Sequence, residues 1–290
     1  LDALEEEMRR VSAAVRAAGL SVMTVYIGGG TPTALTTKQL RRVMRSLREH
    51  FDLSGVCEYT VEAGRPDTAD AEKLSMIAQE GATRVSVNPQ TMDDRILELM
   101  GRRHTAADIV RMVEDIRRIG GLQINMDVIA ALPGENYAMF AHTLEEIRKL
   151  QPESLTVHTL AIKRSSRLHE EKYAQREQDV ARMVALGRQT AHDMGMRAYY
   201  LYRPKYMAEN LENVGYALPG HFCRYNIDNM EETTSILALG AGGISKCVMR
   251  EEEKILRAPN IANIEQYIDR VDEMIERKRV VFAEKAKKID

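Results

Sequence analysis

Along its first 160 residues, the chain alternates between short apolar runs and longer amphipathic segments. The apolar runs, rich in β-branched residues, predict five strands, within residues 20–27, 55–64, 83–88, 122–132 and 154–161. Apolar residues at helical spacing predict helices over residues 1–18, 36–51, 68–81, 91–101, 105–121 and 137–151. Thr36 with Gln39, and Thr105 with Asp108, are expected to cap two of these helices. This alternation predicts a parallel sheet with right-handed crossovers, either as a barrel or as an open sheet.

Four of the five predicted strands have one apolar face and one polar face. The residues of the polar faces are Glu58, Thr60 and Glu62; Arg84, Ser86 and Asn88; Gln123, Asn125 and Asp127; and Thr156 and His158. A sheet with one face in water would give this pattern, but the regular intervening helices favour a barrel with a polar interior. An ordinary (β/α)8 barrel is filled with branched apolar side chains, and five strands are too few for it. A polar interior indicates that a ligand or cofactor lies inside.

After about residue 172 the pattern changes. It predicts a helix over 177–194, a strand over 196–202, an irregular segment over 203–226, an apolar stretch over 236–245 and a charged helix over 261–279. We therefore expect a barrel core over residues 1–170. A C-terminal α+β part, over residues 171–290, is expected to complete the barrel and to cover the substrate site.

The composition is that of a globular protein, with 44% hydrophobic and 29% charged residues. A net charge of −2 gives no overall basic field, so neither nucleic acid nor an anionic membrane is an expected partner. Three widely spaced cysteines argue against a disulfide framework and favour a reducing, cytoplasmic environment. We find no signal peptide and no apolar run long enough to span a bilayer. Because the chain begins "LDALEEEMRR", without Met and in a helical pattern, we expect a fragment.

The segment "YIGGGTPTAL", residues 26–35, places three glycines directly after the first predicted strand. Glycine reaches positive φ and lets the backbone approach another molecule closely. Gly28, Gly29 and Gly30 therefore fit either a loose turn or a close approach to a ligand. The segment alone leaves both interpretations open.

The order and spacing of several segments resemble a known enzyme family. These segments are "GGGTPTAL", "VEAG", "VSVNPQ", "GRRH", "INMDVIAALPG" and "LGAGGIS". Together they resemble the oxygen-independent coproporphyrinogen III oxidases (HemN-like radical SAM enzymes) over about residues 1–255. The segment "NLENVGYALPG" followed by "CRYNIDNMEET" is most similar to the coproporphyrinogen dehydrogenase (HemZ) branch. The resemblance implies an α/β fold, a partial open (β/α)6 barrel that here lacks its first strand, with S-adenosylmethionine (SAM) and a [4Fe–4S] cluster at the carboxyl ends of the strands.

The resemblance also implies which residues contact SAM. These cofactor-binding residues are Gly29, Gly30, Thr31, Glu62, Gln90, Arg102, Asp127, Ala161 and Ile244. The glycine segment is expected to lie along the methionine end of SAM, where a side chain would stand in the way. Glu62, Gln90 and Asp127 lie at or just beyond strand ends on the predicted polar face, so we expect them to converge on one interior. No catalytic residue is assigned.

The sequence departs from the family in its cysteines. Radical SAM enzymes hold their cluster with three thiolates spaced C-x3-C-x2-C after the first strand. Cys57, Cys223 and Cys247 do not have this spacing, and no metal ligand is predicted in this chain. In the family the motif comes just before the helix with which this chain begins. We therefore expect the motif shortly upstream of Leu1, and we expect the chain as given to hold no cluster and to be inactive alone.

The activity implied by the resemblance is oxidative decarboxylation of two propionates of coproporphyrinogen III to vinyl groups. This reaction gives protoporphyrinogen IX in haem biosynthesis. An adenosyl radical made from SAM takes a hydrogen from each propionate, and a separate electron donor reduces the cluster. The substrate carboxylates need cations, for which the candidates are Arg84, Arg103, Lys163, Arg164, Arg203 and Lys205.

The alternative is a haem chaperone of the HemW-like branch, which shares "GGGTP" and "GR-x-H" with this chain. His104 would be a haem ligand in such a protein. The "NLENVGYALPG" segment favours the dehydrogenase branch instead. A sugar-phosphate or nucleotide barrel enzyme fits neither the strand count nor the polar interior.

Overall fold

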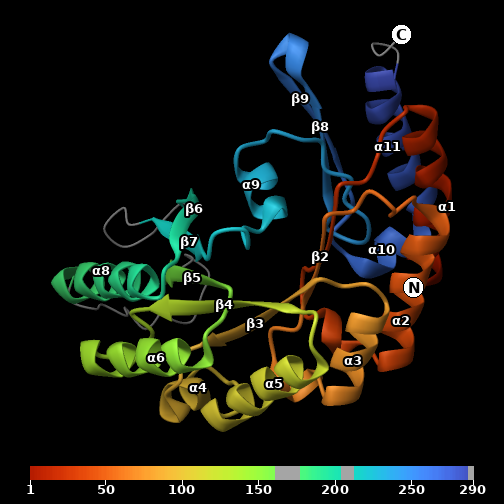
Figure 1. Ribbon diagram of the computed structural model, residues 1–290. Coiled ribbons are helices and arrows are strands. Elements are labelled where there is room, and N and C mark those ends of the chain that lie inside the picture. The colour runs from red at the N-terminus through yellow and green to blue at the C-terminus, as the bar shows by residue number, and fades with distance from the viewer. Residues whose placement is uncertain (161–176, 204–211, 287–290) are drawn as a thin grey trace. The chain divides into compact units, whose positions relative to one another are not determined.

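The structure is a computed structural model that describes residues 1–160, 177–203 and 212–286 (Figure 1). Ala161, one of the residues expected at SAM, lies outside the described residues. The same holds for three of the basic residues considered for the substrate, Lys163, Arg164 and Lys205.

Strands and helices alternate through the first half of the chain, as the sequence predicts. The strands are β1 (Thr24–Ile27), β2 (Glu58–Glu62), β3 (Arg84–Gln90), β4 (Gln123–Ala130), β5 (Ser154–Thr159), β6 (Arg197–Tyr202), β7 (Asn213–Ala217), β8 (Ile244–Met249) and β9 (Lys254–Pro259). The α-helices are α1 (Asp2–Ala17), α2 (Thr37–His50), α3 (Ala71–Gln79), α4 (Asp94–Leu99), α5 (Ala106–Ile119), α6 (Tyr137–Leu150), α8 (Glu177–Asp193), α9 (Arg224–Met230), α10 (Ile264–Asp269) and α11 (Val271–Ala286). Short 3-10 helices are η1 (Pro32–Ala34), η2 (Pro66–Thr68) and η4 (Arg250–Glu252).

The helix ends test two local predictions. Thr105 begins α5 with a capping box, because its side chain accepts a hydrogen bond from the Asp108 N–H and its own N–H donates to the Asp108 carboxylate at 2.7 Å. This cap confirms the prediction. The single charged helix predicted over residues 261–279 is wrong. The backbone leaves the helical conformation at Arg270, and two helices, α10 and α11, form instead.

A seven-stranded sheet in the order β1-β2-β3-β4-β5-β7-β6 is the centre of the fold. β2, β3, β4 and β5 pair in parallel, which confirms the predicted arrangement. β7 lies between β5 and β6 and is antiparallel to both. The sheet is curled and mainly parallel, so the fold is an α/β half-barrel, as expected for an open (β/α) barrel.

Strand β7 falls in the segment predicted to be irregular, so that prediction is wrong there. The strand is short and contains Gly215, and glycine weakens strands on its own. A neighbouring strand requires this glycine, because a Cβ at Gly215 would lie 1.8 Å from Cε1 of Tyr200 on β6. The Tyr200 ring therefore lies across β7 and reaches β5, where its hydroxyl is 3.2 Å from Oγ1 of Thr156.

Helices cover one face of the sheet and enclose an apolar core (Figure 1). α5 packs against β3, α8 packs against β4 and β5, α3 contacts α5, and α6 contacts α8. The apolar strand faces supply the buried core residues Val61, Val85, Val87, Ile124, Met126, Val128, Leu155 and Val157. Because side chains alternate along a strand, the polar faces point to the other side of the sheet.

The chain divides into two compact units. We call residues 26–37 and 59–223 the sheet unit, and residues 1–25, 38–58 and 224–290 the hairpin unit. The hairpin unit contains the antiparallel β8–β9 hairpin, which packs against α11, and α11 also packs against α1. The expected domain boundary near residue 170 is not tested by this division and stays a prediction.

A network of buried polar groups stabilises the hairpin unit. Glu7 on α1 and Lys278 on α11 are fully buried and form an ion pair at 2.6 Å. Glu7 also accepts hydrogen bonds from the Asn260 amide at 2.9 Å, the Gly240 N–H at 2.8 Å and the Tyr267 hydroxyl at 2.7 Å. Lys278 donates a further hydrogen bond to Asn260. Burial lowers the pKa of Lys278, while the charge of Glu7 opposes that shift. Each carboxylate oxygen of Glu7 therefore has two donors.

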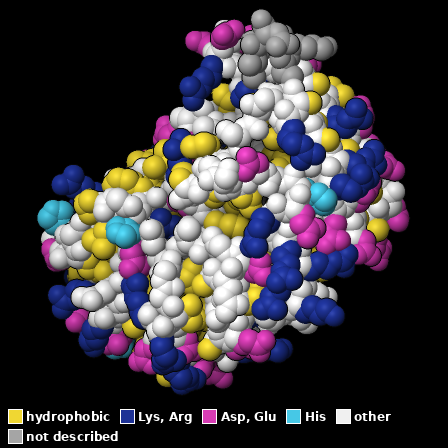
Figure 2. All heavy atoms as spheres, turned by 45° about the vertical axis from the view of Figure 1, so that its right-hand side comes forward, with side chains coloured by type: hydrophobic (Ala, Val, Ile, Leu, Met, Phe, Trp, Pro, Cys, Tyr) yellow, Lys and Arg dark blue, Asp and Glu magenta, His cyan; other side chains and the backbone are white. Residues whose placement is uncertain are grey.

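The surface carries charges of both signs. Figure 2 shows Lys and Arg side chains intermingled with Asp and Glu side chains on one face of the molecule. Many of these charges are paired locally, as Arg118 is with Asp115 at 2.6 Å on α5. Among the residues that the structure describes, no helix is long and apolar enough to cross a membrane.

Candidate cofactor site

The three glycines after β1 have different structural roles. A Cβ on Gly28 would lie 2.5 Å from Cε1 of Tyr26 and 2.9 Å from Oε1 of Glu62, so the position requires glycine. Gly29 has a φ of 86°, in the left-handed region that favours glycine. Gly30 has no positive φ, and a Cβ there would meet no atom within 4 Å. Neighbouring side chains thus explain Gly28, and a positive φ explains Gly29, while Gly30 faces open space.

A buried lysine joins the glycine loop to the loop after β2. Lys73 on α3 donates hydrogen bonds of 2.6 Å to the carbonyl oxygens of both Thr33 and Thr68. The hydroxyls of Thr33 and Thr68 also lie 2.6 Å apart. Because a buried ammonium needs such acceptors, these contacts hold the two loops in one arrangement. Both loops line the same pocket.

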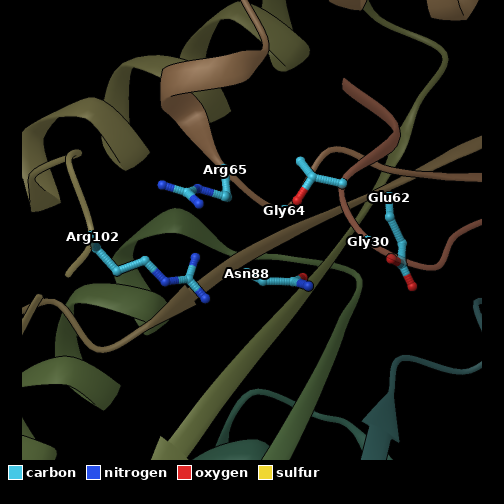
Figure 3. Close-up of a pocket in the computed structure, with 7 residues that line it drawn as sticks. Gly30, Glu62, Gly64, Arg65, Asn88 and Arg102 are labelled. Atoms are coloured by element: carbon cyan, nitrogen blue, oxygen red, sulfur yellow. The ribbon is translucent and has the colours of Figure 1, made fainter. Parts of the chain in front are cut away.

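This pocket lies at the carboxyl ends of β1, β2 and β3 and has a volume of about 100 Å³. Its lining residues are Gly30, Thr31, Glu62, Gly64, Arg65, Asn88 and Arg102. In Figure 3, Arg65 and Arg102 lie on one side of the pocket, Glu62 lies on the other, and Asn88 lies between them. Open α/β sheets bind ligands at the carboxyl ends of their strands. The pocket therefore has a negative side and a positive side at the usual place for a ligand.

Glu62 forms the negative side. Its Oε1 accepts a hydrogen bond of 2.6 Å from the hydroxyl of Tyr26 on β1. Burial raises the pKa of Glu62, the Tyr26 hydrogen bond opposes this shift, and the charge of Asp127 adds to it. A cationic group of a ligand would stabilise the carboxylate in this setting.

Arg65 and Arg102 form the positive side. Arg65 donates from Nε and Nη2 to the two carboxylate oxygens of Asp67, each at 3.2 Å. Nη1 of Arg102 is buried and has no hydrogen-bond partner among the described residues. Burial lowers the pKa of Arg102, and the nearby charge of Arg65 lowers it further. A buried guanidinium nitrogen without an acceptor, close to a second cation, favours an anionic ligand.

The polar faces of β3, β4 and β5 form one hydrogen-bond network. Ser86 donates to Asn88 at 2.7 Å, and the Asn125 amide donates to Ser86 at 2.9 Å and to Asp127 at 3.0 Å. Ser154 donates to Asn125 at 3.0 Å. Ser86, Asn125 and Ser154 are all buried. The alternative of a sheet face in water is therefore wrong, and the predicted polar interior is confirmed. Because Asn88 also lines the pocket, the network reaches it.

Asp127 lies elsewhere in this network, near His158. Nε2 of His158 is 3.8 Å from Oδ1 of Asp127, and Nδ1 of His158 is 3.1 Å from the hydroxyl of Tyr202. Burial alone would raise the pKa of Asp127. The nearby His158 imidazole and a hydrogen bond from Asn125 outweigh burial, so the pKa of Asp127 is lowered. Asp127 thus offers a carboxylate acceptor to the polar interior.

Four of the nine residues expected at SAM line the pocket together: Gly30, Thr31, Glu62 and Arg102. Gly29 precedes them in the same loop. Asp127 does not line the pocket, but its charge acts on Glu62. The structure thus brings together four of the nine residues that the resemblance selects, while their contact with SAM stays a prediction.

The remaining expected residues are placed differently. Gln90 ends β3 with a φ of 67°, and its Oε1 is buried without a partner among the described residues. Its convergence with Glu62 and Asp127 stays a prediction. Ile244 begins β8 in the hairpin unit and is 50% exposed. Its contact with SAM also stays a prediction, as does that of Ala161.

Sequence analysis did not assign Gly64, Arg65 or Asn88 to the site. Asn88 belongs to the predicted polar face of its strand, and Arg65 directly follows the "VEAG" segment, so both carried a signal. Gly64 carried no such signal, because the need for glycine there comes from a neighbouring strand. A Cβ there would lie 3.1 Å from Nδ2 of Asn88, which is a tight contact.

The structure also reduces the number of basic residues that are candidates for binding the carboxylates of a substrate. Arg84 is 3% exposed and donates to the Ser154 hydroxyl at 3.2 Å and to the His221 carbonyl at 2.9 Å. Its guanidinium is therefore engaged inside the protein rather than open to a substrate. Arg203 is exposed and lies 2.9 Å from Glu212, and Arg103 is exposed. Both stay candidates.

Residues 2–147 match the model of the Radical SAM superfamily. The chain therefore belongs to the radical SAM superfamily. Over 280 residues it is 39% identical to the "oxygen-independent coproporphyrinogen-III oxidase-like protein HemZ" of Bacillus subtilis (strain 168), which covers 95% of this chain and 56% of that protein.

Two further relatives match a shorter part of the chain. The heme chaperone HemW of Bacillus subtilis is 36% identical over 166 residues, covering 56% of this chain and 42% of that protein. The oxygen-independent coproporphyrinogen III oxidase of Escherichia coli (strain K12) is 34% identical over 161 residues, covering 56% of this chain and 35% of that protein. The chain thus spans about half, or less, of the length of these relatives.

The fold matches a solved structure. The chain is similar to coproporphyrinogen III oxidase (HemN) from Escherichia coli, described as a radical SAM enzyme, with a TM-score of 0.73 and 24% identity. The match covers 95% of this chain and 62% of that one. It confirms the predicted class of fold, a radical SAM half-barrel.

The family implies SAM and a [4Fe–4S] cluster, and the described residues fit them unequally. A ligand end with an ammonium and a carboxylate, such as the methionine end of SAM, matches a pocket with Glu62 on one side and the unpartnered Arg102 Nη1 on the other. In contrast, the described residues contain no group of three or more His, Cys, Asp or Glu side chains that could hold a metal ion. Cys57, Cys223 and Cys247 are separate free thiols. The described part of the chain therefore does not itself supply the ligands of a cluster.

Proposed function

We propose that the pocket at the carboxyl ends of β1, β2 and β3 binds the methionine end of SAM. The observation that carries this proposal is the opposed charge of the pocket, with Glu62 facing Arg65 and Arg102 across a space that Gly30 leaves open. The ammonium of SAM lies at Glu62, whose raised pKa a neighbouring cation would lower. The carboxylate lies at Arg102, whose buried Nη1 needs an acceptor.

The other residues of the site orient SAM. The backbone at Gly30 and Thr31 approaches the methionine chain closely, because no side chain stands between them at Gly30. Asp127 accepts a hydrogen bond from the nucleoside part, and Asn125 and His158 hold its carboxylate ionised and in place. Bound SAM supplies the adenosyl radical chemistry of the superfamily.

We further propose that the protein acts on coproporphyrinogen III and converts two of its propionates to vinyl groups. The 39% identity to HemZ over 95% of this chain supports this activity. The similarity to the coproporphyrinogen III oxidase of Escherichia coli supports it as well. A separate electron donor is the expected partner.

Two measurements test this proposal separately. Calorimetric titration of SAM into the purified, cluster-containing holoenzyme tests the pocket, and we expect binding that Glu62→Gln weakens. Incubation of the same holoenzyme, which includes the cluster ligands, with coproporphyrinogen III, SAM and a chemical reductant tests the activity, and we expect a product that lacks two carboxyl groups, detected by chromatography and mass spectrometry. A folded protein that binds no SAM would refute the pocket. SAM binding without decarboxylation would refute the substrate and leave the pocket in place.

The second candidate function is haem binding and transfer, which the 36% identity to HemW favours. His104 was the expected haem ligand under this hypothesis. It is 3% exposed, and its Nδ1 lies 3.6 Å from Oδ1 of Asp67. Burial lowers the pKa of His104, and the charge of Arg102 lowers it further. These surroundings favour a neutral histidine that packs against Asp67 over an open haem ligand.

Haem titration distinguishes the two candidates. Under the oxidase proposal, added haem gives no saturable Soret shift, and His104→Ala changes nothing in that spectrum. A saturable shift in the wild-type protein that His104→Ala abolishes would favour the chaperone, especially if coproporphyrinogen III were left unchanged in the anaerobic assay.

A further inference from the structure

Arg65 lines the pocket, yet none of the segments that resemble the family assigns it a role. Two of the five N–H groups of its guanidinium point to Asp67, in a paired contact at 3.2 Å to each carboxylate oxygen. The three other N–H groups are not used by Asp67. Since the Arg65 side chain is 34% exposed and forms part of the pocket wall, a ligand in the pocket can reach it.

The backbone at Arg65 is held in place relative to the glycine loop. The Thr68 hydroxyl donates to the Arg65 carbonyl at 2.9 Å, and it also contacts the Thr33 hydroxyl at 2.6 Å. Lys73 joins the carbonyls of the same two threonines. Arg65 is therefore fixed against the loop that carries Gly30, as a ligand-binding group has to be.

A second cation lies near Arg65. The charge of Arg65 lowers the pKa of Arg102, so the two guanidinium groups repel one another. Asp67 offsets this repulsion in part, but its two oxygens are engaged by Arg65, and Nη1 of Arg102 remains without a partner among the described residues. An anion with two oxygens, placed between the arginines, would satisfy both groups.

We propose that Arg65 and Arg102 together bind the α-carboxylate of the methionine end of SAM, and that Arg65 sets the specificity of the pocket for a ligand that carries this carboxylate. The proposal rests on the proposed function. It makes Arg65 a specificity-determining residue, with Asp67 as the residue that positions it.

The test compares SAM with decarboxylated SAM, which keeps the ammonium, the sulfonium and the adenosine but lacks the carboxylate. Both are titrated calorimetrically into the purified, anaerobically reconstituted protein and its Arg65→Gln variant. We expect Arg65→Gln to weaken SAM binding by about 10–100-fold. Binding of decarboxylated SAM should stay within about threefold of wild type, so the preference for SAM falls by at least about tenfold.

Two further variants separate charge from geometry. Arg65→Lys keeps the charge but loses the planar fork, so it should recover only part of the preference. Arg118→Gln is the matched control, because Arg118 is also paired with a nearby carboxylate, but lies exposed on α5 outside the pocket. It should bind both ligands as the wild type does.

The outcomes distinguish this inference from the proposed function. If the wild-type protein binds no SAM, the proposed function fails first. If SAM binds and Arg65→Gln keeps the wild-type preference, the inference is overturned and the pocket assignment stands. An equal loss for both ligands would also overturn the inference, because it would assign Arg65 a structural role only.

Discussion

Buried polar side chains occur in both units of the protein, but their hydrogen bonding differs. In the hairpin unit, each oxygen of Glu7 accepts two hydrogen bonds or ionic contacts, and Lys278 donates to both Glu7 and Asn260. In the pocket of the sheet unit, Nη1 of Arg102 has no partner among the described residues, and burial raises the pKa of Glu62.

This difference separates a structural network from a binding site. Buried polar groups that satisfy one another leave nothing for a ligand to gain, and they fix the packing of the elements that carry them. Buried groups that lack partners lower stability until a ligand supplies them. We therefore expect substitutions in the first set to change unfolding, and substitutions in the second set to change SAM binding.

The largest expected effect is on stability, from Lys278→Met. This change leaves the Glu7 carboxylate buried without its counter-ion, which lowers the free energy of unfolding by about 3–5 kcal/mol. Urea unfolding followed by circular dichroism measures it. As a control, Arg279→Met removes an exposed partner of Glu276 and should cost less than about 1 kcal/mol. Equal effects of the two changes would contradict the structural role of the network.

Replacing both ion-pair partners sharpens this test. Glu7→Gln combined with Lys278→Met removes both charges, so it should recover much of the stability that Lys278→Met alone loses. A double variant that is less stable than Lys278→Met would mean that the hydrogen bonds of Glu7, rather than its charge pair, dominate.

Gly30→Val should have the next largest effect, on SAM binding. The fold should persist, because a Cβ at Gly30 meets no atom within 4 Å and its φ is not positive. The valine side chain then fills space meant for SAM, and affinity should fall by more than about 100-fold, or about 2.8 kcal/mol. Calorimetry measures the loss, with circular dichroism to check the fold.

Ala34→Val is the matched control for Gly30→Val. Ala34 is exposed in the same loop and lies outside the pocket lining, so the Ala34→Val protein should bind SAM with wild-type affinity. Wild-type affinity in Gly30→Val would mean that the glycine segment is only a turn.

Asp127→Ala should weaken SAM binding by about 1.5–3 kcal/mol, because it removes an ionised hydrogen-bond acceptor. Its effect is smaller than that of Gly30→Val, since it removes one contact without filling the site. Asp115→Ala, on the exposed face of α5, is the control. An unchanged calorimetric affinity in Asp127→Ala would exclude this carboxylate from the SAM site.

The smallest expected effect is a shift in pH dependence. Ionised Glu62 attracts the ammonium of SAM, so affinity should fall as the pH falls through the raised pKa of Glu62. Tyr26→Phe removes the hydrogen bond that lowers this pKa. The acid limb of SAM affinity should therefore move to higher pH, and Glu62→Gln should remove it. Calorimetry across a pH series measures both, and an acid limb unmoved in Tyr26→Phe would contradict the coupling.

The sequence predicted those features of the fold that repeat along the chain. Alternation of apolar and polar residues in β3 and β4 correctly indicated a polar interior, because side-chain direction follows directly from strand geometry. The capping box at Thr105 was also predictable, because its two partners, Thr105 and Asp108, lie three residues apart in the sequence.

Features that depend on contacts between distant segments were not predictable. The structural use of Gly28 depends on the Tyr26 ring and the Glu62 carboxylate, which come from two strands. The sequence predicted no strand at β7, because the need for Gly215 becomes apparent only from its contact with the Tyr200 ring on β6. In the site, motif positions such as Gly30, Glu62 and Arg102 were selected by resemblance. Arg65 was missed because its loop is joined to the glycine loop by the contact between Thr33 and Thr68, which come from segments far apart in the sequence.

The position of the Tyr200 ring across β7 limits which substitutions the protein can accept at position 215. Every single-base change that replaces a glycine adds at least a Cβ or ends the chain. At position 215 such a Cβ would meet the Tyr200 ring at 1.8 Å, so the ring has to swing away and its hydroxyl loses Thr156. Gly215 can therefore be replaced without this loss only when a smaller residue has already replaced Tyr200. In a library of random variants, substitutions at these two codons should survive together more often than apart.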